Sequence, residues 1–580
     1  MLTTIQTAEN QVRACVEAAL TRAIADGALP QADLPAFTVE EPNDRSHGDL
    51  AANVAMVAAR AFRMAPRAIA DAIAGRLDLS GTYFEKAEVA GAGFLNFFLS
   101  PAFYGAAVAE VLAKGDRYGE SDVGGGEKVM VEYVSANPTG PMHMGNARGG
   151  ALGDCLASVM QAAGYDVWRE FYVNDAGNQI EKFAVSLEAR YLQLFLGEDA
   201  VEFPEDAYHG DDIRDHAAAF AKLHGDRYVN APESERRDAL VQYALPLNID
   251  KMHRDLEKYR IVYDRWFLES ELHQNGEVKA VIDILTKNGL TYEKDGALWY
   301  KNVEVLTKKL LAEGKSQADI DKLELKDDVL VRQNGNPTYF AADIAYHRNK
   351  FARGFTTCID VWGADHHGHV ARMKGAMDAI GCNGDGLQVL LVQLVRLMRD
   401  GEVVRMSKRS GKAIQLADLL DEVPADAARF FFNMTSATNS MDFDLGLAIE
   451  QSSQNPVYYV QYAHARICSI FKKLAESGVT PRDCTAEELA LLVGDEEKEL
   501  IRFIASFTAE IAAAALARDP AKITRYAMEL ATLFHKFYNG CRVMVEDEPL
   551  MQARIALCTA ARITLKNALT LLKITVPESM

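Results

Sequence analysis

The stretch from Lys128 to Val173 constrains the fold more than any other part of the sequence. It begins with an apolar, strand-like run (128–135), continues through a turn rich in proline and glycine, and then has a helical pattern from about 144 to 163 that ends at Gly164. A second strand-like run, VWREFYV, follows. Strand, helix and strand in this order predict a parallel sheet with a right-handed connection.

The rest of the chain predicts three domains, since 580 residues are enough for several hydrophobic cores. Residues 1 to 120 mix helical and strand-like patterns and should form a small α+β unit. Residues 121 to 415 should form the parallel-sheet domain, interrupted at about 190 to 325 by a charged, mostly helical insertion. Residues 416 to 580 show helical periodicity almost throughout, which predicts an all-α helix bundle.

Composition indicates a reduced, cytoplasmic protein. The eight cysteines are far apart and lack the paired spacing of a zinc or redox site. No signal peptide is evident, and no run of about 18 apolar residues predicts a membrane span. The formal net charge of −20 taken alone argues against a nucleic-acid partner, because phosphate binding requires lysine and arginine. A nucleic-acid surface would therefore have to be local.

The turn after the first strand is the first candidate site. It reads Ser135-Ala-Asn137-Pro-Thr-Gly-Pro-Met-His143-Met-Gly145-Asn146 and precedes a helix. Ligands of parallel α/β sheets bind at the carboxyl ends of strands, and a helix start attracts phosphate. Gly145 would let a flat base approach the backbone, and His143 could donate to a phosphate oxygen. An alternative is that these residues only shape a turn and cap a helix.

A basic loop about 260 residues later is the second candidate. It contains Arg405, Met406, Ser407, Lys408 and Lys412 and follows an apolar strand. A lysine on such a loop could close over a triphosphate and neutralise charge on leaving pyrophosphate. Taken alone, the loop could equally be a solvated basic surface. The two segments together, in this order, strengthen the nucleotide interpretation.

Both segments resemble the signatures of class I aminoacyl-tRNA synthetases. His143-Met-Gly145-Asn146 is similar to their HIGH motif, and Met406-Ser407-Lys408 is similar to their KMSK loop, with asparagine replacing the second histidine and Arg405 replacing the first lysine. Segments 131–154, 172–180, 339–347, 362–370 and 461–467 resemble the arginyl family in particular. The resemblance implies a Rossmann-type catalytic domain that joins L-arginine to tRNA(Arg) through arginyl-adenylate, with release of AMP and diphosphate, once tRNA is bound.

The resemblance also implies roles for single residues. His143, Gly145, Asn146 and Lys408 would act in catalysis, and these four with Met406 and Ser407 would bind ATP. Arginine would be bound by residues from several segments: Glu132, Ser135, Asn137, Tyr339, Asp343 and His367. Glu132 would meet the α-amino group of arginine.

Tyr339 and Asp343 also suit arginine on physical grounds. They are four residues apart and would share one face of a helix. A guanidinium group offers five donors in a plane, which a carboxylate matches well. An alternative is that Asp343 is an ordinary surface residue.

Three histidines beside Asp365, at positions 366, 367 and 369, raise the possibility of a metal site. No second cluster completes a tetrahedral set, so no metal site is expected here. Mg²⁺ is expected to arrive with ATP and to be held by phosphates and water.

The expected tRNA contacts lie at the two ends of the chain. Asp426-Ala-Ala-Arg429 resembles the DALR signature of a helical anticodon-binding domain, and Tyr462, Arg466, Tyr538 and Met580 fall where that domain contacts tRNA. Phe94 and Asn96 resemble the part of the N-terminal domain that binds the tRNA elbow. Each of these residues could instead belong to a hydrophobic core.

Three alternatives remain open. A small-molecule nucleotidyltransferase shares the HIGH-type turn but needs no helical C-terminal third. A catalytically inactive tRNA-binding paralogue would explain Asn146 and Arg405, although Lys408, Asn137 and Asp343 argue against it. A glutamyl or lysyl enzyme is disfavoured by Tyr339 and Asp343. A monomer is favoured because no exposed heptad pattern is evident.

Overall fold

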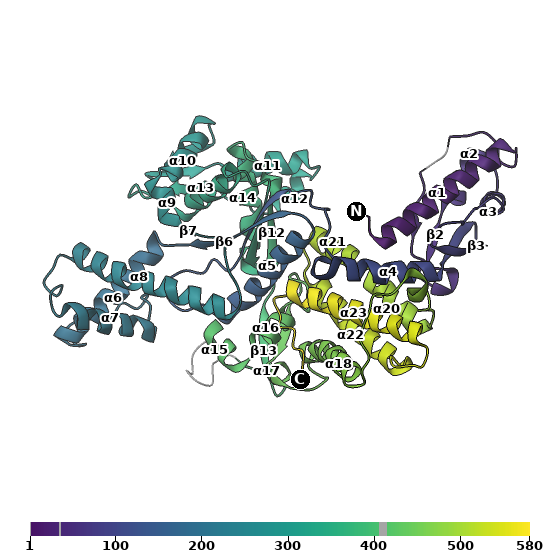
Figure 1. Ribbon diagram of the computed structural model, residues 1–580. Helices are drawn as coiled ribbons and strands as arrows, with labels where there is room; N and C mark the ends of the chain where they lie inside the picture. The colour runs from purple at the N-terminus through teal and green to yellow at the C-terminus, as the bar shows by residue number, and fades with distance from the viewer. Residues whose placement is uncertain (1, 34–35, 405–413) are drawn as a thin grey trace.

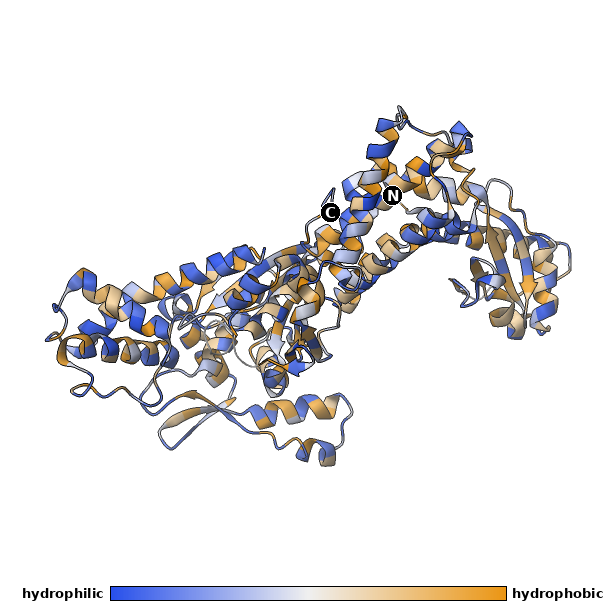
Figure 2. Cartoon of the chain, turned by 90° about the horizontal axis from the view of Figure 1, so that it is seen from below, coloured by the Kyte–Doolittle hydropathy of each residue, from blue (hydrophilic) through white to orange (hydrophobic). Residues whose placement is uncertain are grey.

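The computed structural model describes residues 2–33, 36–404 and 414–580. The chain is elongated in both views (Figures 1 and 2), with an N-terminal α+β unit at one end, a three-helix unit at the other, and the parallel sheet and C-terminal helices between them. Most helices show both hydrophilic and hydrophobic stretches in Figure 2. Such helices bury one face and expose the other.

The N-terminal unit packs helices on a four-stranded antiparallel sheet. The strand order is β1 (Val39–Glu40), β2 (Leu50–Ala52), β4 (Phe94–Leu99) and β3 (Phe84–Ala90). The helices are α1 (Thr4–Ala25), α2 (Val54–Phe62) and α3 (Pro66–Ala74). Alternate residues of β4 (Leu95, Phe97 and Leu99) enter the core, as expected for a strand with one buried face.

Helix α4 (Pro101–Lys114) leads from this unit to the C-terminal helices, which it contacts along its length. Just after it, the Tyr118 hydroxyl donates to the Ile504 carbonyl at 2.8 Å. Asn567 donates to the carbonyls of Gly115 and Tyr118. The N-terminal unit is therefore held by the part of the chain that is furthest from it in sequence.

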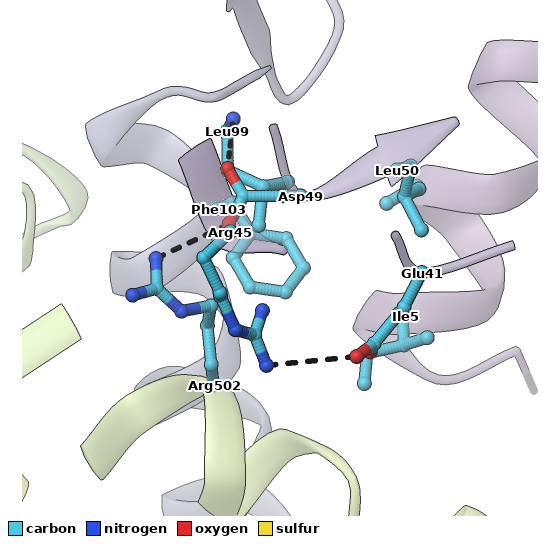
Figure 3. A pocket seen from close by; sticks show the side chains of 9 residues that line it. Ile5, Glu41, Arg45, Asp49, Leu50, Leu99, Phe103 and Arg502 are labelled. Carbon is cyan, nitrogen blue, oxygen red and sulfur yellow. Dashed lines mark hydrogen bonds and ion pairs between the residues drawn. The ribbon is translucent and has the colours of Figure 1, made fainter. Parts of the chain in front are cut away.

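A pocket lies in the seam between the N-terminal unit and the C-terminal helices (Figure 3). Arg502, from helix α20 (Asp495–Ala505), reaches Asp49 at 3.2 Å and donates to the Tyr104 hydroxyl at 2.6 Å. Asp49 in turn accepts from the Leu99 backbone N–H at 2.9 Å. These contacts tie the α20 helix to the edge of the N-terminal sheet.

The central sheet has five strands, all parallel, as the sequence predicts. The order is β12 (Leu387–Val392), β11 (Thr357–Gly363), β5 (Lys128–Glu132), β6 (Asp166–Val173) and β7 (Arg265–Leu268). Helix α5 (Met144–Ala162) connects β5 to β6, and α14 (His367–Ala379) precedes β12. The strand order reverses between β5 and β11, which is where ligands bind in sheets of this kind.

The expected insertion of about 190–325 is split by β7, which belongs to the central sheet. Before β7, three helices form a unit with its own core: α6 (Asn178–Leu196), α7 (Asp211–His224) and α8 (Glu233–Lys258). After β7 come α9 (Glu269–Gln274), α10 (Glu277–Lys287), α11 (Asn302–Ala312), α12 (Gln317–Asp321) and the antiparallel sheet of β8 (Thr291–Lys294), β9 (Ala297–Tyr300) and β10 (Asp328–Val331). Helix α13 (Tyr339–Ala352) then leads back to β11.

The C-terminal third is helical, as predicted, with one exception. Its helices are α15 (Leu416–Glu422), α16 (Ala425–Phe432), α17 (Leu445–Ile449), α18 (Pro456–Glu476), α19 (Ala486–Leu489), α20, α21 (Phe507–Ala517), α22 (Ala521–Gly540) and α23 (Glu548–Leu571). The exception is β15 (Met441–Asp444), which pairs in parallel with β13 (Val395–Arg399), itself paired with β14 (Glu402–Val403). Of the described helices, the stretch Asp495–Ala517 is long and apolar enough to cross a membrane, but half of it is buried in this protein.

Candidate active site

The turn after β5 has a strained backbone. Val134 has a φ of 72° and Ser135 a φ of 41°, a region that side chains other than glycine rarely adopt. This turn brings the Ser135 hydroxyl back to donate to Glu132 Oε1 at 2.8 Å, and the Ser135 hydroxyl oxygen accepts from the Tyr172 backbone N–H at 3.2 Å. Strain of this kind is found where a side chain must be held for binding or catalysis.

The His143 tetrad lies at the start of α5. His143 is the N-cap residue, and its backbone N–H donates to Asn146 Oδ1 at 3.1 Å. A side chain added at Gly145 would meet none of the described atoms within 4 Å. Among the described residues, the start of helix α5 therefore lies beside open space, and a helix start attracts phosphate.

The residues that follow the second predicted segment lie beside this tetrad. Met406, Ser407 and Lys408 lie outside the described residues, but the chain that follows them is described. The Met144 N–H donates to the Ile414 carbonyl at 3.0 Å, and the Leu416 N–H donates to the Met142 carbonyl at 2.9 Å. The end of the basic loop is thus joined by backbone hydrogen bonds to the turn that carries His143.

An acidic pocket lies beyond the carboxyl end of β6. The Tyr172 hydroxyl donates to Glu269 Oε2 at 2.8 Å, and Asp343 lies 3.2 Å from His369 Nε2. The Tyr339 hydroxyl accepts from the Gln179 N–H at 3.1 Å. Among the residues that the structure describes, neither Glu269 nor Asp343 forms an ion pair with a lysine or an arginine.

The acidic character of this pocket also affects the pKa of Glu269. Burial is the main cause of a pKa of about 7 for the Glu269 carboxyl; the Tyr172 hydroxyl opposes this increase, and the neighbouring carboxylates of Asp343 and Asp175 contribute to it. Burial is also the main reason that the pKa of Tyr172 lies well above its usual value. A pocket that holds a carboxyl at the edge of ionisation favours a cationic ligand.

Of the residues of this pocket, the sequence led us to expect Tyr339 and Asp343 but not two others. Glu269 and Tyr172 were not identified, because a glutamate after a short strand and a tyrosine inside another strand carry no local signal. His367, expected to bind arginine, is exposed at the start of α14, whereas His369 two residues later is the histidine that contacts Asp343. Asn137 is exposed on the turn after β5.

The structure brings three of the expected tRNA contacts together on α18 and α22. Arg466 donates to the Tyr462 hydroxyl at 2.9 Å, and its guanidinium lies 4.8 Å from the Tyr462 ring centroid and 5.2 Å from that of Tyr538. Met580 is half exposed, on a tail whose Pro577 carbonyl contacts His464 of α18. We call Tyr462, Arg466 and Tyr538 the aromatic cluster.

The expected contacts in the N-terminal unit lie together on β4. Phe94 and Asn96 are on the face opposite to the core residues of that strand, although Asn96 is only 4% exposed. The two side chains follow the strand alternation and therefore point to the same side. Lys86 lies over the ring of Phe98 on this same face, 4.8 Å from its centroid.

Arg429 is buried between domains, and Asp426 is half-buried beside it. The Arg429 guanidinium is fully buried; it pairs with Asp154 of α5 and donates to the carbonyls of Tyr259 and Leu572. Asp426 accepts from the Thr575 N–H at 2.9 Å. These two residues join the helix that begins at the active site to the C-terminal end of the bundle.

Comparisons with known families agree with this architecture. The description "tRNA synthetases class I (R), catalytic domain" matches residues 107–449, "Arginyl tRNA synthetase N terminal domain" matches 10–99, and "DALR anticodon binding domain" matches 460–580. The parallel sheet, the His143 turn and these matches define a class I aminoacyl-tRNA synthetase.

The relatives narrow this class to one family. The chain is 50% identical to the arginine–tRNA ligase of Acetivibrio thermocellus over the whole of both chains, and 54% identical to that of Caldanaerobacter subterraneus over 99% of each. The Thermus thermophilus arginyl-tRNA synthetase structure shares the fold, with a TM-score of 0.70 at 22% identity over 98% of this chain and 100% of that one. The chain belongs to the arginine–tRNA ligase family, whose function is the aminoacylation of tRNA(Arg) with arginine.

Proposed function

We propose that this chain performs the family reaction with the acidic pocket as its arginine site. The observation that carries the proposal is that Glu269 and Asp343 lie together in the pocket without a lysine or arginine partner among the described residues. A guanidinium group supplies the missing positive charge and fits a carboxylate with two parallel hydrogen bonds. Tyr339, one turn before Asp343, adds a hydroxyl oxygen that can accept a further hydrogen bond.

The α-amino and carboxylate end of arginine would lie toward the turn after β5. Glu132, held by the Ser135 hydroxyl, would accept from the α-amino group. Asn137, exposed on the same turn, would donate to the substrate carboxylate or to ATP. His367 lies at the start of α14, on the opposite side of the switch point, where the bound adenylate would be expected.

ATP would bind at the start of α5. His143 and Asn146 would contact the phosphates and the sugar, and the open space at Gly145 would admit the base. Met406, Ser407 and Lys408 would close over the triphosphate, with Lys408 neutralising charge on the leaving pyrophosphate. Mg²⁺ would arrive with ATP and be held largely by the phosphates and water.

The chemistry then depends on positioning rather than on a covalent nucleophile. One oxygen of the arginine carboxylate attacks the α-phosphorus of ATP, and the bond to the pyrophosphate oxygen breaks. The terminal ribose hydroxyl of tRNA next attacks the activated carbonyl, and AMP leaves. Low substrate mobility and charge neutralisation by the protein lower the barriers to both steps.

The tRNA would contact both ends of the protein. The aromatic cluster offers ring faces on which unpaired anticodon bases can stack, with Arg466 between two of the rings. Met580 would contribute from the C-terminal tail, and Phe94 with Asn96 would meet the tRNA elbow. We also propose that the protein acts as a monomer in the cytoplasm.

ATP–pyrophosphate exchange with each amino acid, with and without total tRNA, tests the proposal. Exchange should occur with arginine alone and only when tRNA is present. Asp343→Asn should abolish most of this exchange, while Asp442→Asn, which removes an exposed surface ion pair with Arg396, should not. Absence of exchange under every condition would instead support a tRNA-binding paralogue without activity.

A further inference from the structure

Three neighbouring strands of the central sheet carry a buried carboxylate at the same level. Glu132 of β5 is opposite Asp360 of β11 on one side and Glu170 of β6 on the other. Their exposed fractions are 7%, 0% and 0%. Adjacent strands are only about 4.8 Å apart, so three buried anions in one row repel one another unless cations lie between them. We call these three residues the carboxylate row.

Helix α13 supplies the cations at its C-terminal half. Lys350, which is fully buried, donates to Glu132 Oε2 and to Asp360 Oδ1, the latter at 2.7 Å. His347 Nε2 lies 2.7 Å from Asp360 Oδ2, and its Nδ1 lies 2.7 Å from the Asp343 carbonyl. Both ring nitrogens of His347 therefore face oxygen atoms, and Lys350 places one cation between two carboxylates.

Arg353 and Glu170, the third member of the carboxylate row, form an ion pair that does not contact Glu132. Arg353 donates to both oxygens of Glu170 at 2.6 Å. Glu170 is bound further by the Tyr346 hydroxyl at 2.9 Å and by the Trp168 ring N–H at 3.0 Å. This pair docks the same helix on the same sheet, which makes it a control for any effect of docking alone.

We propose that Lys350 is a positioning residue for arginine binding, which keeps Glu132 ionised and directs it toward the α-amino group. The proposal rests on the role of Glu132 proposed above. Each oxygen of Glu132 already accepts one hydrogen bond, from Ser135 and from Lys350. A carboxylate oxygen can accept a second, so the amino group completes a set whose orientation the protein has fixed.

The surroundings of Glu132 show why a cation is required. Burial is the largest influence on the Glu132 carboxyl and raises its pKa, and the charge of Asp360 raises it further. The charge of Lys350 is the main opposing influence, followed by that of His347. Other ionisable groups near Glu132 are Glu170, which pairs with Arg353, and four groups whose pKa values burial raises: Tyr172, Tyr263, Tyr346 and Cys358. Removal of Lys350 therefore favours the protonated form of Glu132.

The decisive measurement is the KM for arginine in tRNA aminoacylation between pH 6.5 and 8.5, expressed as the ratio of variant to wild type. The ratio cancels the titration of Glu269 and of the substrate, which is common to both proteins. The double substitution Lys350→Met with Asp360→Asn removes one charge of each sign. It should raise the KM about 10- to 100-fold at pH 7, and the ratio should fall about fivefold or more by pH 8.5, as Glu132 ionises again.

Two further proteins separate positioning from docking. Arg353→Met with Glu170→Gln removes the matched buried pair, and its KM ratio should not change with pH. Lys350→Met with Glu132→Gln should have the same KM as Glu132→Gln alone within about threefold, because Lys350 acts through Glu132. The comparison of Lys350→Met with Glu132→Gln against Glu132→Gln alone tests the inference even if Lys350→Met with Asp360→Asn does not fold.

The outcomes are distinct. The inference would be overturned by two results together. The KM ratio would be independent of pH in both buried-pair variants, and the increases in KM caused by Lys350→Met and Glu132→Gln would multiply in the double variant. Lys350 would then only dock α13 on the sheet. An unchanged KM for Glu132→Gln would instead remove the proposed role of Glu132 itself. Lys350→Arg retains the charge and should keep the ratio flat with pH.

Discussion

Glu269→Gln is the substitution that most directly tests the acidic pocket. Glutamine has the same shape as glutamate and can still accept from the Tyr172 hydroxyl, so the pocket should keep its structure. What is lost is a negative charge beside the guanidinium. A hydrogen bond to a charged group is worth about 1.5–3 kcal/mol, which predicts a KM for arginine about 10- to 150-fold above wild type at pH 8.

The pKa of Glu269 adds a pH dependence to this prediction. With a pKa of about 7, the free carboxyl is about 90% ionised at pH 8 and about 10% ionised at pH 6. Arginine binds the ionised form, so the complex holds fewer protons than the free enzyme and affinity rises with pH up to about 7. The wild-type KM should therefore increase up to tenfold from pH 8 to pH 6, whereas that of the variant should not show this increase.

Steady-state aminoacylation of tRNA at pH 6, 7 and 8, with arginine as the varied substrate, provides the assay. Glu271→Gln is the matched control, because Glu271 is on the same helix but pairs with Arg265 at 2.6 Å, near the surface. It should leave the KM for arginine within about twofold of wild type. If Glu269→Gln binds arginine as tightly as wild type at pH 8, Glu269 does not contact the guanidinium and the reasoning fails.

Three further predictions concern other parts of the protein. Gly145→Val should raise the KM for ATP at least about tenfold with little change in melting temperature, because its side chain would enter open space rather than a packed core; a lower melting temperature would contradict this. Arg429→Met should lower the free energy of unfolding by about 3–5 kcal/mol in denaturant titrations, since it removes the buried partner of Asp154 and leaves only Arg169, at 3.8 Å, to balance that carboxylate. Tyr462→Ala should raise the KM for tRNA about 5- to 100-fold and leave the KM for arginine unchanged. An unaltered KM for tRNA would mean that no base stacks on Tyr462.

Local signals predicted the parts of the site that are contiguous in sequence. The turn from Ser135 to Asn146 was recognisable because proline and glycine interrupt an apolar strand just before a helix. Tyr339 and Asp343 were recognisable because a spacing of four places two side chains on one helical face. In each case a few neighbouring residues determine the local geometry.

The carboxylate row could not be predicted in the same way. Its residues are separated by up to 228 positions, and their contact depends on the register of three parallel strands, which no segment encodes alone. Strands β7 and β15 were missed for a related reason. Each has four residues, and each forms only because an existing strand provides a pairing edge.

The net charge of −20 gave a misleading indication about nucleic acid. An average over 580 residues does not reveal that Arg466 lies between two tyrosine rings on one surface. Spatial grouping of a few side chains decides whether a base can stack there.

The docking of α4 on the last helices has a consequence for synthesis on the ribosome. Tyr118 is translated 449 positions before Asn567, one of its partners in the folded protein. At about 5–20 residues per second, roughly 20–90 s pass before that partner exists. During this interval the part of α4 that packs against α19, α20 and α23 has no surface to cover it. The nascent chain should therefore depend on a chaperone until its final helix emerges, and truncation of α23 should expose the first hundred residues to aggregation.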